Sequence, residues 1–196
     1  WLILSWPRLK IFALFIICLT VIYSGYFNVF GAIAAMKETD FPFDKYQGAG
    51  QWLKNNTPPN SIVFNASWDN FPQLFFYNHQ NYYIVGMDPT FMYVYNQKIY
   101  WFWRNITIQG IICSQPEKEC LSSVYTQKFS QRREDLSQLL KNQFRAKYIF
   151  IDNQKWGGQF QKHQVFQKIL ENSSLFRKVY QDKKYPEVIV FQLKDN

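Results

Sequence analysis

A long apolar segment near the N-terminus differs from the rest of the chain. Between positions 9 and 35 the only charged residue is Lys10. A membrane-spanning helix needs about 20 mostly apolar residues, and this segment is longer than that. A secretory signal peptide is the alternative, with a cleavage site among residues 32–35, but its apolar part is usually about 7–15 residues long. The pattern therefore predicts a retained transmembrane helix over 9–36, followed by a separate domain over 37–196.

The charges that flank this segment predict its orientation. Arg8 and Lys10 lie at its N-terminal end, whereas acidic and basic residues are mixed between Lys37 and Lys45. Positively charged flanks tend to stay on the cytoplasmic side of a membrane. We therefore expect a cytoplasmic N-terminus and a domain that lies in the periplasm, outside the cell or in an organelle lumen.

Residues 1–8 form a separate short stretch. Residues 1–6 are mostly apolar, and a basic turn with Pro7 and Arg8 follows them. The favoured interpretation is the tail of a preceding transmembrane helix. The alternative is an apolar stub in the membrane interface, where tryptophan is common.

After the apolar segment, strand and helix patterns alternate. Short runs of β-branched and aromatic residues predict strands, and apolar positions three or four residues apart predict helices. The predicted helices cover 44–55, 96–104, 133–144 and 161–170, and the predicted strands cover 61–64, 82–85, 148–151, 176–180 and 188–191. Residues 66–73 are expected to form a loop. This order predicts a layered α/β domain with a mixed sheet, in which the last two strands pair as an antiparallel hairpin.

Composition and charge narrow the classes of partner. Apolar residues make up 47% of the 196 residues and charged residues 18%, with a formal net charge of +8. The basic residues are scattered and acids flank the densest pairs, so no long basic stripe exists for nucleic acid. We expect the lipid bilayer as a partner and no nucleic acid.

The cysteines allow one possible disulfide, and the histidines give no sign of a metal site. Cys113 and Cys120 bracket a polar loop, and an extracytoplasmic compartment permits a disulfide between them, which leaves bonded and free forms as alternatives. Cys18 is expected to be a small apolar residue of the transmembrane helix. His79 and His163 have no partner at ligand spacing, so no metal site is expected. His163 is predicted on the polar face of its helix.

Two polar loops are the candidates for chemistry. Trp68 and Asp69 follow the first strand, and Asp88 and Thr90 follow the second. Ligands of open α/β sheets bind beyond the carboxyl ends of strands, so these four residues are predicted to bind substrate at one edge. An aromatic ring beside a carboxylate suits sugar or amide recognition. The alternative is that both aspartates are turn residues, which cap loops.

The motifs of phosphate-binding, hydrolase and zinc-protease sites are missing from the sequence. It contains no glycine-rich phosphate loop, no Gly-x-Ser-x-Gly elbow and no His-Glu-x-x-His motif. We therefore expect no cofactor and no catalytic residues in this segment.

The stretch from residue 48 to residue 71 resembles the start of the soluble C-terminal domain of oligosaccharyltransferase catalytic subunits. The shared pieces are a helix with Trp52 and Leu53, then Asn56-Thr57-Pro58, the strand 61–64, and a partial match to a Trp-Trp-Asp-Tyr-Gly motif. More broadly, the layout is similar to bacterial multi-span glycosyltransferases that use polyprenol-linked sugars. In these proteins the last transmembrane helix leads into an extracytoplasmic α/β domain of this size.

The resemblance implies a role in acceptor binding. Trp68 and Asp69 match the second and third positions of the motif, which contacts the hydroxyl residue of an acceptor peptide in that family. Ser67, Asn70 and Phe71 depart from it, which favours another acceptor, such as a lipid-linked glycan. The catalytic acids and metal ligands of the family lie in loops between earlier transmembrane helices, so this segment is expected to shape an acceptor site without being catalytic.

Two hypotheses from different classes remain. In the first, the chain is the C-terminal part of a glycosyltransferase-like protein, with upstream transmembrane helices and a polyprenol-linked sugar as partners. In the second, it is a non-enzymatic, single-span accessory subunit that contacts other membrane subunits through its helix and through the aromatic residues 93–103. An extracytoplasmic sensor is a weaker third hypothesis, because no feature of the sequence favours it.

Overall fold

The fold is known from a computed structural model. It describes residues 7–38, 42–116, 119–120, 129–153, 155–156, 160–161 and 163–194. The chain divides into two compact units, Trp1–Pro42 and Phe43–Asn196. The proposed tail of a preceding helix in residues 1–6 lies outside the described residues.

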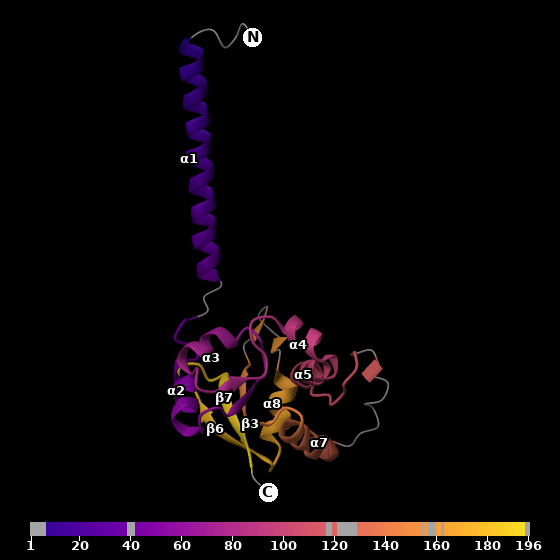
Figure 1. Cartoon of the computed structure of the whole chain (residues 1–196). Coiled ribbons are helices and arrows are strands. Elements are labelled where there is room, and N and C mark those ends of the chain that lie inside the picture. Colours follow the sequence, from indigo (N-terminus) through magenta and orange to yellow (C-terminus); the bar gives the residue numbers. More distant parts are fainter. Residues whose placement is uncertain are drawn as a thin grey trace. The chain divides into compact units, whose positions relative to one another are not determined.

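The first unit contains one long helix, α1 (Pro7–Glu38), shown in Figure 1. Its residues Lys10–Ala34 are long and apolar enough to cross a membrane. At 1.5 Å per residue this part is about 37 Å long, which exceeds the roughly 30 Å of a hydrocarbon core. Polar side chains bond back to the helix: Thr20 Oγ1 donates to the carbonyl of Ile16 at 2.8 Å. Such bonds satisfy polar groups where water is absent.

The second unit is built on a five-stranded mixed sheet with the strand order β2-β1-β3-β7-β6. The strands are β1 (Ile62–Asn65), β2 (Tyr82–Tyr83), β3 (Ala146–Asp152), β6 (Phe176–Gln181) and β7 (Val188–Leu193). Strand β1 runs parallel to β2 and β3, whereas β7 runs antiparallel to β3 and β6. The α/β class, the mixed sheet and the final antiparallel hairpin are therefore confirmed.

Helices cover both faces of this sheet. They are α2 (Gln47–Asn56), α3 (Phe71–Tyr77), α4 (Pro89–Tyr95), α5 (Gln97–Gln109), α7 (Phe129–Asn142) and α8 (Gln164–Glu171). Alternate side chains of β3 enter two separate cores: Ile149 and Ile151 pack with α5, α7 and α8, whereas Tyr148 and Phe150 pack with α2 and α3. Figure 1 shows these two groups of helices on opposite sides of the strands. The domain is thus a three-layered sandwich.

Two helices begin where the sequence pattern indicates loops or turns. The predicted loop 66–73 ends early, because α3 starts at Phe71 with Pro72 in its first turn. Likewise, α4 starts at Pro89, directly after the cap residue Asp88. Proline is tolerated in the first helical turn, where its missing N–H has no helical partner to lose. Both prolines therefore begin a helix instead of marking a loop.

Smaller differences occur at the ends of other elements. The second strand stops at Tyr83, although the apolar run continues to Val85. A short antiparallel hairpin, β4 (Lys155–Trp156) with β5 (Phe160–Gln161), precedes α8, which therefore begins at Gln164 and not at residue 161.

Candidate binding site at the carboxyl edge of the sheet

The loops that follow β1 and β2 meet at one edge of the sheet, because these strands run parallel. Asn65, the last residue of β1, is buried and joins the two loops. Its Nδ2 donates to the carbonyls of Ser67 at 2.9 Å and Val85 at 2.7 Å, and its Oδ1 accepts from the Val85 N–H at 3.2 Å. Trp103 Nε1 donates to the Asn65 carbonyl at 3.0 Å. These hydrogen bonds hold the two loops together and form a platform at this edge of the sheet.

Trp68 and Asp69 lie at the exposed part of this platform. The Trp68 side chain is 41% exposed, and Asp69 is exposed next to it. The following residue, Asn70, is buried and anchors the loop from below. An indole and a carboxylate are thus presented to solvent on a loop that is held at both ends. The sequence predicted this pairing of side chains at the carboxyl end of the first strand.

A buried polar network supports the loop. Asn70 Nδ2 donates to the Tyr46 hydroxyl at 2.6 Å, and that hydroxyl donates to Asp152 Oδ2 at 2.5 Å. Lys45 Nζ lies 2.8 Å from the same Asp152 oxygen and 3.3 Å from Glu187 Oε1. Asp152 ends β3, the strand next to β1, and with Glu187 included, residues from four separated parts of the chain meet in this network.

The electrostatics of this network follow from its burial. Removal from water raises the pKa of the Asp152 carboxyl above its ordinary value, and the hydrogen bonds from Lys45 and Tyr46 oppose that rise. Burial also raises the pKa of the Tyr46 hydroxyl, with Asp152 and then Asp69 adding to the effect.

Asp88 and Thr90 take part in the start of a helix, and for Asp88 this is close to the alternative of a capping turn residue. Asp88 is the N-cap of α4, and its Oδ1 accepts from the Thr90 N–H at 2.8 Å. Hydrogen bonds from the Thr90 side chain and then from its N–H hold the pKa of Asp88 below its ordinary value. Of the four predicted residues, Trp68 and Asp69 share one loop, whereas Asp88 and Thr90 begin a helix.

Two hollows flank α4 on different sides. One, of about 350 Å³, is mostly apolar and is lined by Asp88 and Phe91 together with residues of the β2–α4 loop, α5 and the end of α7. The other, of about 320 Å³, is lined by Thr90 with Tyr93, Tyr100 and Trp101. The two predicted residues therefore border separate hollows.

The aromatic segment 93–103 is only partly a surface. Tyr95 is 88% exposed, but Trp103 is buried in the core and donates to the Asn65 carbonyl. The expectation that the whole segment is a contact surface is therefore wrong at Trp103. Helical periodicity explains the difference, because α5 turns one side of this aromatic run toward the sheet.

The histidines correct one expectation. His79 is exposed, whereas His163 is buried and precedes α8 as its N-cap residue, so it does not lie on a polar helix face. Its Nδ1 lies 2.7 Å from the Thr107 carbonyl, which ties α8 to α5. Among the described residues no group of three or more His, Cys, Asp or Glu side chains could hold a metal ion.

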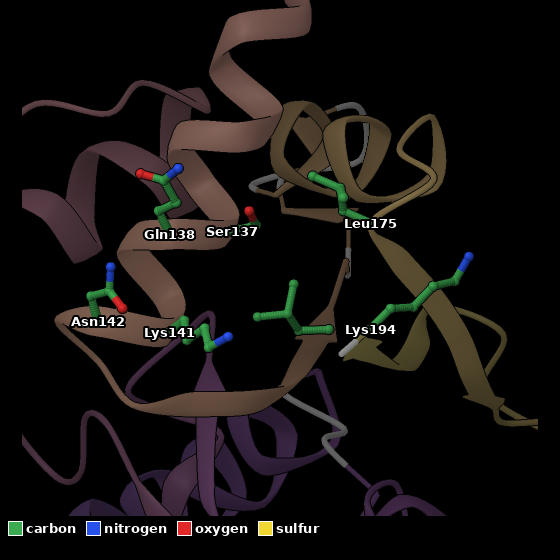
Figure 2. A pocket seen from close by; sticks show the side chains of 7 residues that line it. Ser137, Gln138, Lys141, Asn142, Leu175 and Lys194 are labelled. Atoms are coloured by element: carbon green, nitrogen blue, oxygen red, sulfur yellow. The ribbon is translucent and has the colours of Figure 1, made fainter. Parts of the chain in front are cut away.

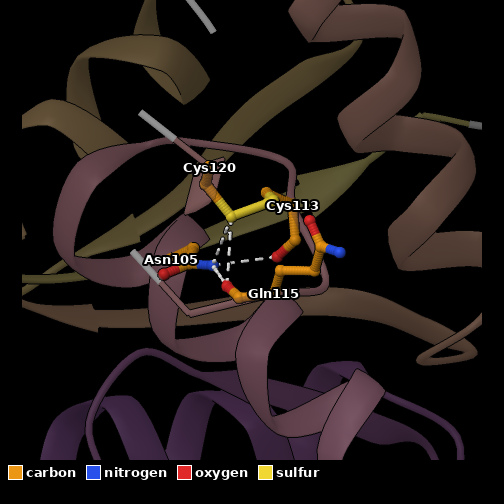
Figure 3. The surroundings of a disulfide bond; sticks show 4 residues. All are labelled: Asn105, Cys113, Gln115 and Cys120. Atoms are coloured by element: carbon orange, nitrogen blue, oxygen red, sulfur yellow. Dashed lines mark hydrogen bonds between the residues drawn. A yellow bond between two sulfur atoms is a disulfide. The ribbon is translucent and has the colours of Figure 1, made fainter. Parts of the chain in front are cut away.

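The structure joins Cys113 and Cys120 by a disulfide. Figure 3 shows the buried Asn105 of α5 beside this bond, where its Nδ2 donates to the carbonyls of Cys113 at 2.9 Å and Gln115 at 2.8 Å. Of the two forms that the sequence allowed, the structure has the bonded one. The bond closes a small loop against α5 and does not reach the candidate site loop.

A further hollow of about 460 Å³ lies beside α7 and the end of β7. Figure 2 shows Lys141 and Lys194 on opposite sides of this hollow, with Ser137 and Gln138 above them on the helix, and Leu193 also lines it. Because Lys194 follows the carboxyl end of β7, which runs antiparallel to β3, this hollow lies at the end of the sheet opposite Asp152.

Comparison with known proteins does not assign the chain to a family: no family model matches it, and no curated protein matches it significantly.

The buried network of Lys45, Tyr46, Asn70 and Asp152 was not predicted from the sequence. Its members are up to 107 positions apart, and no local pattern signals such a pairing.

Proposed function

We propose that the unit Phe43–Asn196 is the extracytoplasmic domain of a glycosyltransferase-like membrane protein, where it shapes the binding site of a polyprenol-linked or glycan acceptor and is not itself catalytic. The observation that carries the proposal is the loop of Trp68 and Asp69, exposed at the carboxyl edge and braced by the buried network below it. A fixed aromatic ring beside a carboxylate supplies a stacking surface and a hydrogen-bond acceptor for a sugar.

The attachment of the domain to the membrane helix supports a lipid-borne substrate. Lys45 and Tyr46 belong to the first turn of the domain, and both contact Asp152 at the carboxyl end of β3. The chain therefore enters the domain at the same edge that carries Trp68 and Asp69. A substrate held in the bilayer by a polyprenol would have to approach this edge.

Photo-crosslinking tests the proposal. The cross-linking amino acid p-benzoylphenylalanine replaces Trp68 in the chain in its source membranes, after metabolic labelling with a radioactive sugar. We expect a sugar-labelled, lipid-extractable adduct, and we expect Asp69→Asn to abolish it without lowering the unfolding temperature. The same cross-linker at Tyr82, an exposed aromatic at the other end of the sheet, is the matched control. Adducts with protein alone, or none, would overturn the proposal.

The alternative is an accessory subunit of a membrane complex. The intact mass of the native polypeptide distinguishes it from the glycosyltransferase-like protein. A mass well above 23.6 kDa supports a multi-span enzyme that carries its catalytic residues upstream. A mass near this value, with co-purifying membrane subunits, would favour the accessory role.

A further inference from the structure

The second unit exposes an unusually large number of apolar side chains on two short helices and the segments before them. They are Phe43, Phe75, Phe76, Met87, Phe91, Val94 and Tyr95, and together they are called the aromatic face. Exposed apolar patches on this scale mark sites of protein or membrane contact. Helix α4 has no buried residue: Met92 is partly buried and packs against the core, whereas Phe91, Val94 and Tyr95 are exposed.

Ring contacts connect the start of the domain with α3, and one of the α3 rings packs on the segment that leads to α4. The ring of Phe43 lies 5.1 Å from that of Phe76, and Phe75 stacks on Phe71 at 5.4 Å. A Cβ atom at Gly86 would lie 3.1 Å from the Phe71 ring, so this ring packs directly on the backbone that leads to α4. Figure 1 shows α3 and α4 at the same end of the domain, away from the C-terminus.

Only a short segment of chain joins Phe43, the first residue of this face, to the candidate membrane helix. Phe43 follows the last residue of α1, Glu38, by five positions. Five extended residues reach at most about 18 Å. If Lys10–Ala34 spans the bilayer, Phe43 cannot move farther than this from the end of α1. A short tether keeps the local concentration of lipid surface high at all times, so even weak contacts become populated.

A basic turn lies beside the point where the chain enters the domain. Lys184 Nζ lies 2.8 Å from Asp44 Oδ2, and the Tyr185 hydroxyl donates to Asp44 Oδ1 at 2.9 Å. The neighbouring Lys183 is exposed. Cations next to a membrane attract anionic headgroups, and aromatic rings concentrate at the membrane–water interface. Rings and cations thus occur together at the tether.

We propose that the aromatic face docks on the lipid headgroup region of the membrane that α1 spans, with Phe75 and Phe76 as its inserted residues. Lipid is the occupant that the tether keeps within reach of the face. The proposal rests on α1 being a transmembrane helix and not on the proposed acceptor role. Docking would orient the edge with Trp68 and Asp69 toward the bilayer surface.

Spin-label depth measurements test the proposal on the full chain. One chain is placed in each lipid nanodisc, with Cys18→Ala to remove the free thiol and a nitroxide on His79→Cys, an exposed position that neighbours Phe75. We expect collisions with oxygen to exceed those with a water-soluble nickel chelate. A label on Lys194→Cys, at the opposite end of the sheet, should show the reverse. Changing Phe75 and Phe76 together to serine should move the label at 79 into water, whereas Tyr82→Ser should not.

Two results would overturn lipid docking, and both come from the chain with its aromatic face intact. Water-like collision rates at position 79 would mean that the face is free. Low rates with both oxygen and nickel would mean that protein covers it, as in contact with a second copy of the chain. Neither result would bear on the capture of a sugar-labelled lipid at Trp68, so failure of docking is distinguishable from failure of the proposed function.

Discussion

Buried charge decides how firmly the candidate site loop is held. Lys45 is 1% exposed and pairs with Asp152, whose own side chain is 4% exposed. Removing one member of a buried pair leaves the other charge without its counter-ion and typically costs about 3–5 kcal/mol. We therefore expect Lys45→Met to lower the free energy of unfolding by about 3 kcal/mol at pH 7. Urea titration of the purified full chain in detergent measures this change.

The pH dependence of this variant has a definite sign. Lys45 is the first of the contacts that hold down the pKa of Asp152, so Lys45→Met raises that pKa further. The folded variant then binds a proton that the unfolded chain has already released, and its stability increases as pH falls toward the unfolded value of about 3.9. Lys184→Met, which removes only the exposed pair with Asp44, is the matched control and should change little. A deficit that grows on acidification would contradict the assignment.

The sequence predicted the exposed part of the site but not its support. Trp68 and Asp69 were predicted because they directly follow an apolar strand, and adjacency of that kind is a local signal. Lys45 precedes a helix and reads as an ordinary surface cation. Its partner, Asp152, is 107 positions away, and the packing of Tyr46 and α2 against β3 brings the two together. Such contacts depend on tertiary structure, which no local pattern encodes.

At the level of elements, Asp88 differs from Asp69 because Asp88 caps the N-terminus of α4. The Asp88 side chain accepts from the Thr90 N–H, one of the N–H groups that a helix start leaves without a partner. We expect Asp88→Ala to fray α4 and to raise amide exchange in residues 91–95 several-fold. Asp88→Ser, which retains a capping oxygen, should preserve protection. Hydrogen–deuterium exchange measured by mass spectrometry distinguishes the two variants.

The same cap should weaken in acid. Because the pKa of Asp88 is lowered in the folded state, its contribution is present above the unfolded value of about 3.9 and is lost as pH falls through the folded pKa. If Asp88→Ala instead prevented sugar capture while leaving exchange unchanged, Asp88 would belong to the binding site and not to the cap.

The disulfide loop is the second element with a measurable contribution. Cys113 and Cys120 are seven positions apart, and the chain-entropy relation for so small a loop gives about 2.5 kcal/mol. Replacing both cysteines with serine should therefore lower the unfolding temperature, as should reduction of the unmodified chain. Cys18→Ser, which changes only the free thiol in α1, is the control. Equal unfolding temperatures in oxidised and reduced chains would mean that the bond constrains nothing beyond what Asn105 already holds.

Proline shows why element boundaries were harder to predict than element types. Pro72 and Pro89 were interpreted as signs of loops, yet each occupies the first turn of a helix. Proline can end one helix or begin another. Which of the two occurs depends on whether neighbouring residues can cap a new helix. The longer amphipathic helices and the apolar strands could be predicted without knowledge of the capping residues. Burial of one face gives each of them a regular spacing of apolar residues in the sequence.

For the whole molecule, connectivity and surface chemistry point to the same edge of the domain. The domain begins at Phe43, and the parallel strands β1 and β2 end at Asn65 and Tyr83. Several exposed apolar side chains lie on α3 and α4, which follow these two strands. The length of the apolar segment predicted the candidate membrane helix, and hydrophobic periodicity predicted the layered domain. The sequence predicted aromatic residues at this edge but not which of them are exposed, because an exposed ring and a buried ring look alike in a linear pattern.

Dependence on anionic lipid is the prediction that belongs to this scale. Lys183 lies exposed beside the entry point of the chain, whereas Lys194 lies exposed at the other end of the sheet. In nanodiscs that contain phosphatidylglycerol, Lys183→Glu should reduce the depth of the label at position 79, because it replaces attraction to headgroups with repulsion. In pure phosphatidylcholine the same change should have a much smaller effect, and Lys194→Glu should have none in either lipid. If both substitutions reduced the depth equally, the overall charge of the domain and not the placement of its cations would govern docking, and the basic turn would lose its assigned role.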